Sequence, residues 1–372
     1  MARRPDLGFF EGDIDLQKAS TWQAASGPFE EARKIDPLIY RSLTFSLLEN
    51  EAIWTRDWIF VGTTDDIPEA GDLLPYTIGN HGIHIQRMPD GSLEGRFNNA
   101  QHGGCRFVPL QCQQGSKTKC SFTSCGYSRD RGAISAAQGE ASETLMYQYV
   151  GLRPERLLRI SVARQDKLLF VNLNGPNERF EVAQLAGSDI LQACRFSERI
   201  GATTKEYRCN WKTLANALFA HVESCCRDGL VSLSADIAVE DGTGVQEQVS
   251  ATWFYPNLIL LQAGNYVATL GLQPTALEKT LCRIQLFASG TMTSTNQRET
   301  AERLIEIVGT TAEAVQSKST ASSPLPMDDA ETRENLSLQA HWAQSVLISR
   351  VLAMPEVEAH DPMFQPLKNY LI

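Results

Sequence analysis

The sequence has 372 residues, a net charge of −10 and 42% hydrophobic residues, which is typical of a globular protein with two domains or one large domain carrying an inserted one. A pI near 5.2 excludes nucleic acid as a partner, because phosphate binding needs a basic surface. No apolar run approaches the roughly 20 residues that span a bilayer, and the N-terminus lacks a signal peptide pattern, so we expect a cytoplasmic protein.

The first predicted elements are a helix that leads into an aromatic strand, within residues 34–60. Apolar residues at 43–48 give the helix its buried side, and aromatic residues at 54–60 follow. Residues 55–175 are predicted to be mostly β, because short alternating runs are separated by hairpin-like turns, at Pro-Asp-Gly 89–91 and Gln-Asp-Lys 165–167.

The second half mixes helices and strands. The stretch NWKTLANALFAHVESCCRDG predicts one helix with Trp211, Leu214, Leu218 and Val222 near one face, ended by Gly229. Strands are predicted over most of 249–290, and helices over 297–308 and 330–354. The Ser/Thr/Pro-rich loop 317–329 separates those helices and is predicted to be mobile.

Cysteine usage argues against a disulfide framework. The nine cysteines are an odd number in a long chain, and five of them lie scattered outside the segment 98–132. We expect most of the scattered cysteines to be small buried side chains.

Five segments resemble the α subunits of Rieske non-heme iron oxygenases, in the same order and spacing. They are WTRDWIFVGTTDDIPEAGDLLPYTIG, IHIQRMPDGSLEGRFNNAQHGG, CGYSRDRG, KLLFVNLNG and NWKTLANALFAHVE. The resemblance implies an α+β fold in which a Rieske-type antiparallel β domain, residues 51–175, is set into a helix-grip (START-like) catalytic-type domain, residues 176–372. Residues 1–50 would form a helical part that packs on the C-terminal domain.

The ligand positions of the family's 2Fe–2S cluster do not match in this chain. The family pattern is Cys-x-His in one loop and Cys-x-x-His in a second, with thiolates on one iron and imidazoles on the other. Here Ala100 replaces the first Cys while His102 is kept. Aligning the second loop on the Gly-Tyr step at 126–127 places Phe122 at its Cys and Cys125 at its His. We therefore do not expect the usual cluster.

A different metal centre is possible in the same two loops. One imidazole and three thiolates suit a tetrahedral, structural Zn²⁺ site, and the residues that would supply them are His102, Cys105, Cys120 and Cys125. Cys112 is a spare thiol. Two alternatives stay open: the cysteines bind nothing and the loops are held by packing, or the loops hold an unusual Fe–S cluster.

The family's mononuclear iron site does not match either. That iron is held by two His and one carboxylate, and the resemblance places its helix at the Asn-Trp-Lys step. Counting from there puts the two His positions on Glu223 and Asp228, and the carboxylate that links neighbouring subunits on Asn216. The third ligand position falls near Val308, where Glu306 is the closest acid.

These vestigial iron-site positions have three interpretations. Carboxylates alone suit Mg²⁺, Ca²⁺ or Mn²⁺ better than an iron that activates O₂. Glu223 and Asp228 can instead pair with Arg208 or Arg227, or face water. Two buried acids could also fill the former iron pocket, but only with a cation present. Mononuclear iron is not expected in any of the three.

Because both metal sites are altered together, the sequence favours a chain that keeps the fold without the reaction and has no catalytic residues. The first hypothesis is a non-catalytic subunit that joins a catalytic Rieske oxygenase α subunit in a trimer-like ring, served by its reductase. The second is an active oxygenase, a hydroxylase or demethylase, with altered ligands. The third is a small-molecule binding module that uses the helix-grip cavity.

Overall fold

The computed structural model describes residues 15–40, 42–79, 81–97, 158–174, 196, 198–219, 226–228, 232–240, 246–288 and 336–354. The chain forms two compact units, one made of Met1–Ile53 with Val182–Ile372 and the other of Trp54–Glu181. The predicted zinc ligands, the helix 297–308 and the loop 317–329 lie outside the described residues.

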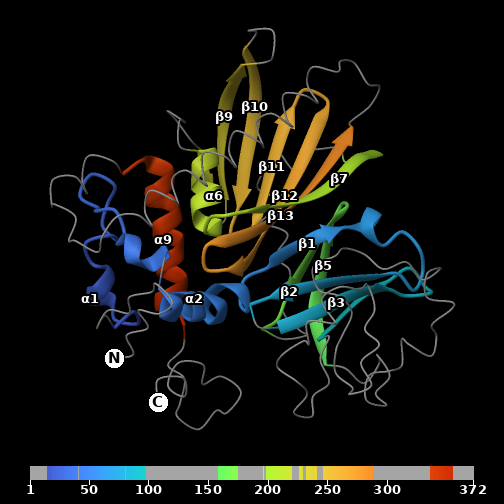
Figure 1. Ribbon diagram of the computed structural model, residues 1–372, viewed down its shortest axis with the longest axis horizontal. Coiled ribbons are helices and arrows are strands. Elements are labelled where there is room, and N and C mark those ends of the chain that lie inside the picture. Colours follow the sequence, from blue (N-terminus) through green and yellow to red (C-terminus); the bar gives the residue numbers. More distant parts are fainter. Residues whose placement is uncertain are drawn as a thin grey trace. The chain divides into compact units, whose positions relative to one another are not determined.

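The unit Trp54–Glu181 contains antiparallel strands (Figure 1), which confirms the predicted β character for its described residues. Its six-stranded sheet has the order β1-β6-β5-β4-β3-β2. The strands are β1 (Ile59–Thr63), β2 (Leu73–Ile78), β3 (His81–Arg87), β4 (Leu93–Phe97), β5 (Arg159–Gln165) and β6 (Leu168–Asn172). A 3-10 turn, η4 (Thr64–Asp66), follows β1.

Two tight turns set the register of this sheet. Between β3 and β4 the amide of Met88 donates to the carbonyl of Ser92 over 2.8 Å, and Gly91 adopts a φ of +83°. Glycine suits that left-handed conformation because it has no Cβ to clash. Asp166 turns the chain between β5 and β6 with a φ of +52°. Both turns were predicted from the sequence and are confirmed.

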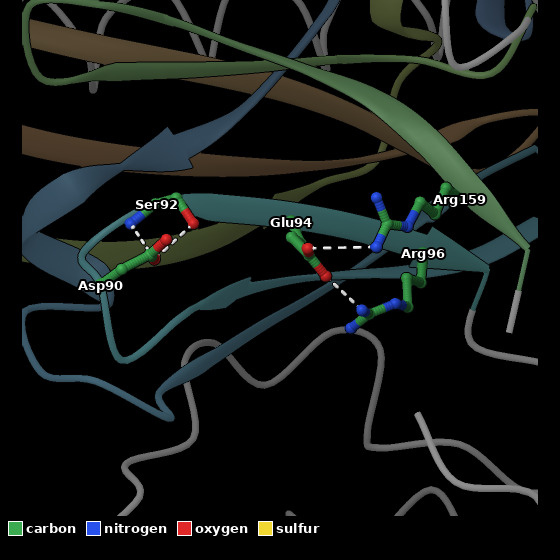
Figure 2. Close-up of polar contacts among 5 residues, drawn as sticks. All are labelled: Asp90, Ser92, Glu94, Arg96 and Arg159. Carbon is green, nitrogen blue, oxygen red and sulfur yellow. Dashed lines mark hydrogen bonds and ion pairs between the residues drawn. The ribbon is translucent and has the colours of Figure 1, made fainter. Parts of the chain in front are cut away.

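A row of basic residues crosses β3, β4 and β5. His84 pairs with Arg96, and Arg96 pairs with Arg159 on the next strand. His84 and Arg96 are buried, with 1% and 2% of their surface exposed. The Glu94 carboxylate lies between the two guanidinium groups and pairs with both, 3.3 Å from Arg159 and closer to Arg96 (Figure 2). One carboxylate thus serves two arginines.

The turn next to this row has its own polar contacts. The Asp90 carboxylate accepts from the amide of Ser92 over 2.9 Å and from its hydroxyl over 2.6 Å (Figure 2). These hydrogen bonds lower the pKa of Asp90. The hairpin is therefore fixed at its tip as well as along its strands.

The unit Met1–Ile53 with Val182–Ile372 contains a seven-stranded antiparallel sheet of order β7-β13-β12-β11-β10-β9-β8. Its strands are β7 (Glu198–Tyr207), β8 (Cys226–Asp228), β9 (Ser232–Glu240), β10 (Gln246–Phe254), β11 (Leu258–Ala263), β12 (Tyr266–Ala276) and β13 (Lys279–Ala288). The strands predicted within 249–290 are confirmed. Cys209 and Cys282 are buried and form no disulfide within the described residues, as expected of scattered cysteines.

Two helices, α6 (Trp211–Leu218) and α9 (Leu338–Leu352), lie side by side on one face of this sheet (Figure 1). Trp253 on β10 faces them: its ring stacks on Phe219, with centroids 6.2 Å apart, and meets Trp342 edge-on at 5.3 Å. Aromatic contacts of this kind bury large apolar areas and stabilise the packing of helix on sheet.

The N-terminal segment of the same unit is short and helical. It contains α1 (Ala19–Trp22), η2 (Pro37–Tyr40), α2 (Leu43–Glu49) and a π-helical turn, η3 (Asn50–Trp54). Gln344 on α9 holds it: the side chain accepts from the amide of Ile35 and donates to the carbonyls of Ala25 and Arg33. His341 adds a 2.9 Å contact to the Gly27 carbonyl.

One predicted helix differs from the structure. The helix expected to run from Trp211 to Gly229 ends at Leu218, and Cys226–Asp228 forms β8, paired with β9. The apolar period predicted Trp211, Leu214 and Leu218 correctly as buried. It did not reveal that residues 226–228 gain hydrogen bonds by extending the sheet, which outweighs their helical spacing. Helix α9 confirms the predicted helix within 330–354.

Within the described ranges, no helix is both long and apolar enough to cross a membrane.

The buried His84 should make this protein less stable at acid pH. Burial first, and the Arg96 charge second, lower the pKa of His84 to about 4, whereas an unfolded histidine titrates near 6.5. Between these two pH values the histidine is protonated in the unfolded chain and neutral in the folded chain. The free energy of unfolding therefore rises with pH across this window. We expect a gain of about 3 kcal/mol from pH 4 to 6.5, measured by urea unfolding. His84→Gln should flatten that slope, and an unchanged slope would contradict the assignment.

Candidate functional site at helix α6

Helix α6 begins at the Asn-Trp-Lys step that the sequence singled out. The Asn210 side chain accepts from the amide of Lys212 over 3.1 Å, which caps the helix N-terminus. Its amide nitrogen donates to the Leu277 carbonyl over 2.9 Å, beyond the end of β12. One asparagine therefore starts the helix and ties it to the sheet.

One side of α6 is packed against its surroundings. Trp211, Leu214, Ala215 and Leu218 are buried, and the helix contacts β12, β13 and α9. The carbonyl of Phe219, the residue after the helix, accepts a hydrogen bond from the Gln339 side chain on α9. Both ends of α6 are thus fixed by side-chain hydrogen bonds from outside its own backbone ladder.

A buried ion pair joins α6 to α2. The Lys212 ammonium lies 2.6 Å from the Glu49 carboxylate, and the two side chains are 6% and 4% exposed. The ammonium also lies over three aromatic rings, 5.3 to 5.5 Å from their centroids; these belong to Tyr40, Phe45 and Trp211. Cation–π contacts of this kind strengthen when water is excluded.

Burial shifts the titration of each member of this cluster. Desolvation raises the pKa of Glu49, and the Lys212 charge and hydrogen bond oppose that rise. Desolvation lowers the pKa of Lys212, and Glu49 opposes that fall. Burial, followed by the Glu49 charge, raises the pKa of Tyr40 to about 12. Such a cluster is stable only while both charges stay together.

Of the sequence-predicted iron positions 216, 223 and 228, the structure describes two, and they lie on different elements. Asn216 lies on α6, partly exposed, and within the described part of the chain its buried side-chain oxygen has no hydrogen-bond partner. Asp228 lies at the end of β8. Glu223 lies outside the described residues, as do His102, Cys105, Cys120 and Cys125.

The donor atoms at these positions do not fit the family's iron groups. Asn216 offers an amide where the family has a carboxylate, and Asp228 offers a carboxylate where it has an imidazole. Ala100 and Phe122 carry no ligand atom at two of the cluster positions. In the portion that the structure describes, no three His, Cys, Asp or Glu residues gather as a metal site would require.

Sequence reasoning missed the ion pair at the start of α6. Glu49 and Lys212 are 163 residues apart, so no local pattern joins them. A partial signal existed: each charged residue directly follows a large apolar residue predicted to be buried, Leu48 and Trp211. On a helix the neighbour of a buried residue can lie at the edge of the same face.

Several known proteins are similar in sequence to this chain, although no family model matches it. The biphenyl 2,3-dioxygenase α subunit of Rhodococcus jostii RHA1 is 26% identical over 283 residues, which is 67% of this chain and 58% of that protein. A benzene 1,2-dioxygenase α subunit of Pseudomonas putida is 23% identical over 68% of this chain and 61% of its own length. The chain thus spans less than two thirds of these relatives.

Solved structures share the fold. The quaternary ammonium Rieske monooxygenase CntA, in complex with gamma-butyrobetaine, has a TM-score of 0.59 at 17% identity and covers 88% of this chain and 98% of its own. A naphthalene 1,2-dioxygenase variant bound to phenanthrene has a TM-score of 0.59 at 14% identity, covering 89% and 95%. The chain is a distant relative of the α subunits of Rieske non-heme iron oxygenases.

Proposed function

We propose that this chain is a non-catalytic, Rieske-oxygenase-like subunit that assembles with a catalytic oxygenase α subunit and supports it. The observation that carries the proposal is where helix α6 ends. The family counterpart of this helix bears iron ligands, whereas α6 ends at Leu218, before the two His-equivalent positions 223 and 228. Lys212, in the first turn of α6, forms a buried ion pair with Glu49.

The proposal includes the finer architecture. Residues 51–175 form the Rieske-like domain and residues 176–372 the helix-grip domain, on which residues 1–50 pack. Two features support it: the antiparallel sheets of the two units, and the Gln344 hydrogen bonds that hold residues 25–35 against α9.

A structural zinc ion replaces the cluster in this proposal, bound by His102, Cys105, Cys120 and Cys125. Support comes from the chemistry of the donors, since one imidazole and three thiolates complete a closed tetrahedral site. A closed site leaves no position for substrate. Electron entry from a reductase would then pass to the partner subunit alone.

The partner is proposed to be a catalytic α subunit in a trimer-like ring. A chain with the same fold can present similar surfaces to a neighbour, so it can occupy one position of a symmetric assembly. Every similar protein named above is a dioxygenase or a monooxygenase, so an active oxygenase with altered ligands is the competing function.

A small-molecule binding role is a second candidate, favoured by one observation. On the sheet face away from Trp253, the register aligns Thr252, Thr269 and Gln285, all buried. Among the described residues the Thr269 hydroxyl has no hydrogen-bond partner. Buried polar groups among apolar ones are typical of ligand pockets. A small molecule that co-purifies with the protein and is lost in a Thr269→Val variant would favour this role.

Removing one partner of the Lys212–Glu49 pair should destabilise the protein much more than replacing both partners together. Lys212→Met or Glu49→Leu alone leaves a buried charge without its partner, and each should lower the free energy of unfolding by about 3–5 kcal/mol. The double variant should lose much less than the sum, as measured by urea unfolding in a double-mutant cycle. Lys279→Met is the control: its pair with Glu206 is exposed, so it should cost under about 1 kcal/mol. Additive single effects would show that the pair is not coupled.

Metal content and co-purification test the proposed function together. Expressed with a catalytic Rieske oxygenase α chain, the tagged protein should retain that chain on affinity resin. Purified alone, it should carry one zinc per chain, no visible Fe–S absorbance and no turnover with a reductase. Cys120→Ser should lose the zinc, while Cys282→Ala, at a buried free cysteine, should keep it.

Two results would overturn the proposal. Stoichiometric iron with substrate turnover by this chain alone would establish the active oxygenase. Failure to retain any α chain, with zinc present, would remove the supporting role and leave the binding module.

A further inference from the structure

We propose that Arg96 and Arg159 form a binding site for a phosphate group, which takes the place that the Glu94 carboxylate occupies between them. The three side chains lie on the neighbouring strands β4 and β5 of the six-stranded sheet (Figure 2). The ligand is free inorganic phosphate or a small molecule that carries a phosphate group. The site lies within the unit Trp54–Glu181, and it goes beyond the function proposed above.

Strand pairing sets two like charges directly opposite each other. Arg96 on β4 is the register partner of Arg159 on β5. Side chains at directly opposed positions are close neighbours on one face of a sheet, and like charges there are destabilising. Glu94, two residues before Arg96, lies on the same face and pairs with both guanidinium groups. Two positive charges therefore share a single negative charge, and one positive charge stays unbalanced within the group.

The two arginines also keep hydrogen-bond donors that Glu94 does not use. Its Oε1 pairs with Arg159 and its Oε2 with Arg96, so neither arginine holds both oxygens. A guanidinium group binds a carboxylate or a phosphate most strongly through two parallel hydrogen bonds. The Nε atom of Arg96 is buried and has no hydrogen-bond partner within the described part of the chain. Because a buried donor without an acceptor is costly, the site favours a group with more oxygens than a carboxylate.

A phosphate group fits both the charge and the donors. It carries about two negative charges and three acceptor oxygens at pH 7, so one group can balance both Arg96 and Arg159. His84, the register partner of Arg96 on β3, adds no charge at that pH, because burial and then the Arg96 charge lower its pKa to about 4. The two arginines thus match one phosphate group, whereas a carboxylate leaves one of them unbalanced.

The site is open to solvent on the Arg159 side. The Arg159 side chain is 63% exposed, that of Glu94 is 24% exposed and that of Arg96 is 2% exposed. Arg159 therefore forms the entrance of the site and Arg96 its floor. Since Glu94 is partly exposed, its carboxylate can turn into water when a phosphate group replaces it, while the buried Arg96 stays in position.

Calorimetric titration of the full-length protein with inorganic phosphate, at constant ionic strength, tests this site. Glu94→Gln removes the competing charge but keeps the shape of the side chain, so it should bind phosphate at least about tenfold more tightly than wild type. Adding Arg159→Gln to that variant should abolish the gain. Arg164→Gln is the matched control, because Arg164 is an exposed arginine of β5 on the opposite face, and it should leave phosphate binding unchanged.

The outcomes separate the site from nonspecific binding. Equal phosphate affinity in wild type, Glu94→Gln and the double variant would overturn the proposal, as would the absence of binding by both wild type and Glu94→Gln. Should Glu94→Gln lose cooperative thermal unfolding, the comparison of wild type with Arg159→Gln and Arg164→Gln decides. Weaker binding in Arg159→Gln alone supports the site, and no difference among the three overturns it.

Phenyl phosphate, titrated in the same way, distinguishes the two sources of the phosphate group. Tighter Arg159-dependent binding of phenyl phosphate than of inorganic phosphate would assign the site to a phosphate ester, and the reverse order would assign it to the free ion. Both results support the site. None of these readouts involves a partner chain or a metal, so a failure here is distinct from a failure of the proposed function.

Discussion

The ion pair between Lys212 and Glu49 is buried on both sides and ties α6 to α2 within one unit. Two charges removed from water remain ionised only if each is matched and hydrogen-bonded. Here the carboxylate meets the ammonium at 2.6 Å, and aromatic rings exclude water around both. The pair therefore dictates that α2 and the first turn of α6 stay in contact. Because α2 lies near residue 45 and α6 near residue 215, it also makes the N-terminal segment an integral part of the sheet unit.

The residues at the start of α6 have structural roles that do not depend on a metal site. Asn210 caps the helix, Trp211 packs in the core and Lys212 forms the ion pair, so each of the three residues has a structural role. None of them requires a metal a few residues downstream. A chain can therefore keep the start of this helix unchanged while its later positions lose their ligands. This explains how a resemblance to an enzyme family can be strong at the Asn-Trp-Lys step and absent at the iron. The residues that determine the fold are different from those that determine the active site.

Much of the fold was predictable because its signals are local. Hairpin turns at 89–91 and 165–167 carry their own conformational preference, and the strands of 249–290 are long apolar runs. The end of α6 was not predictable in the same way. Residues 219–229 continue the helical spacing, but the Phe219 carbonyl bonds to Gln339 and residues 226–228 pair with β9, and neither partner can be read from the local sequence. Ion pairing between Glu49 and Lys212 is hidden for the same reason. The zinc ligands were chosen by donor type alone, and they remain a prediction.

One face of the seven-stranded sheet shows how packing can stabilise this unit without a metal. It is covered by α6 and α9 through the rings of Phe219, Trp253 and Trp342, which need no ion to hold them together. A metal bound only by the folded chain adds stability through mass action, so its loss must be tolerated by the remaining contacts. The aromatic cluster, the Gln344 hydrogen bonds and the buried ion pair supply those contacts on the side of the sheet that faces α6 and α9. None of these named contacts involves residues 216, 223 or 228, so they hold the framework whether or not a metal is bound there.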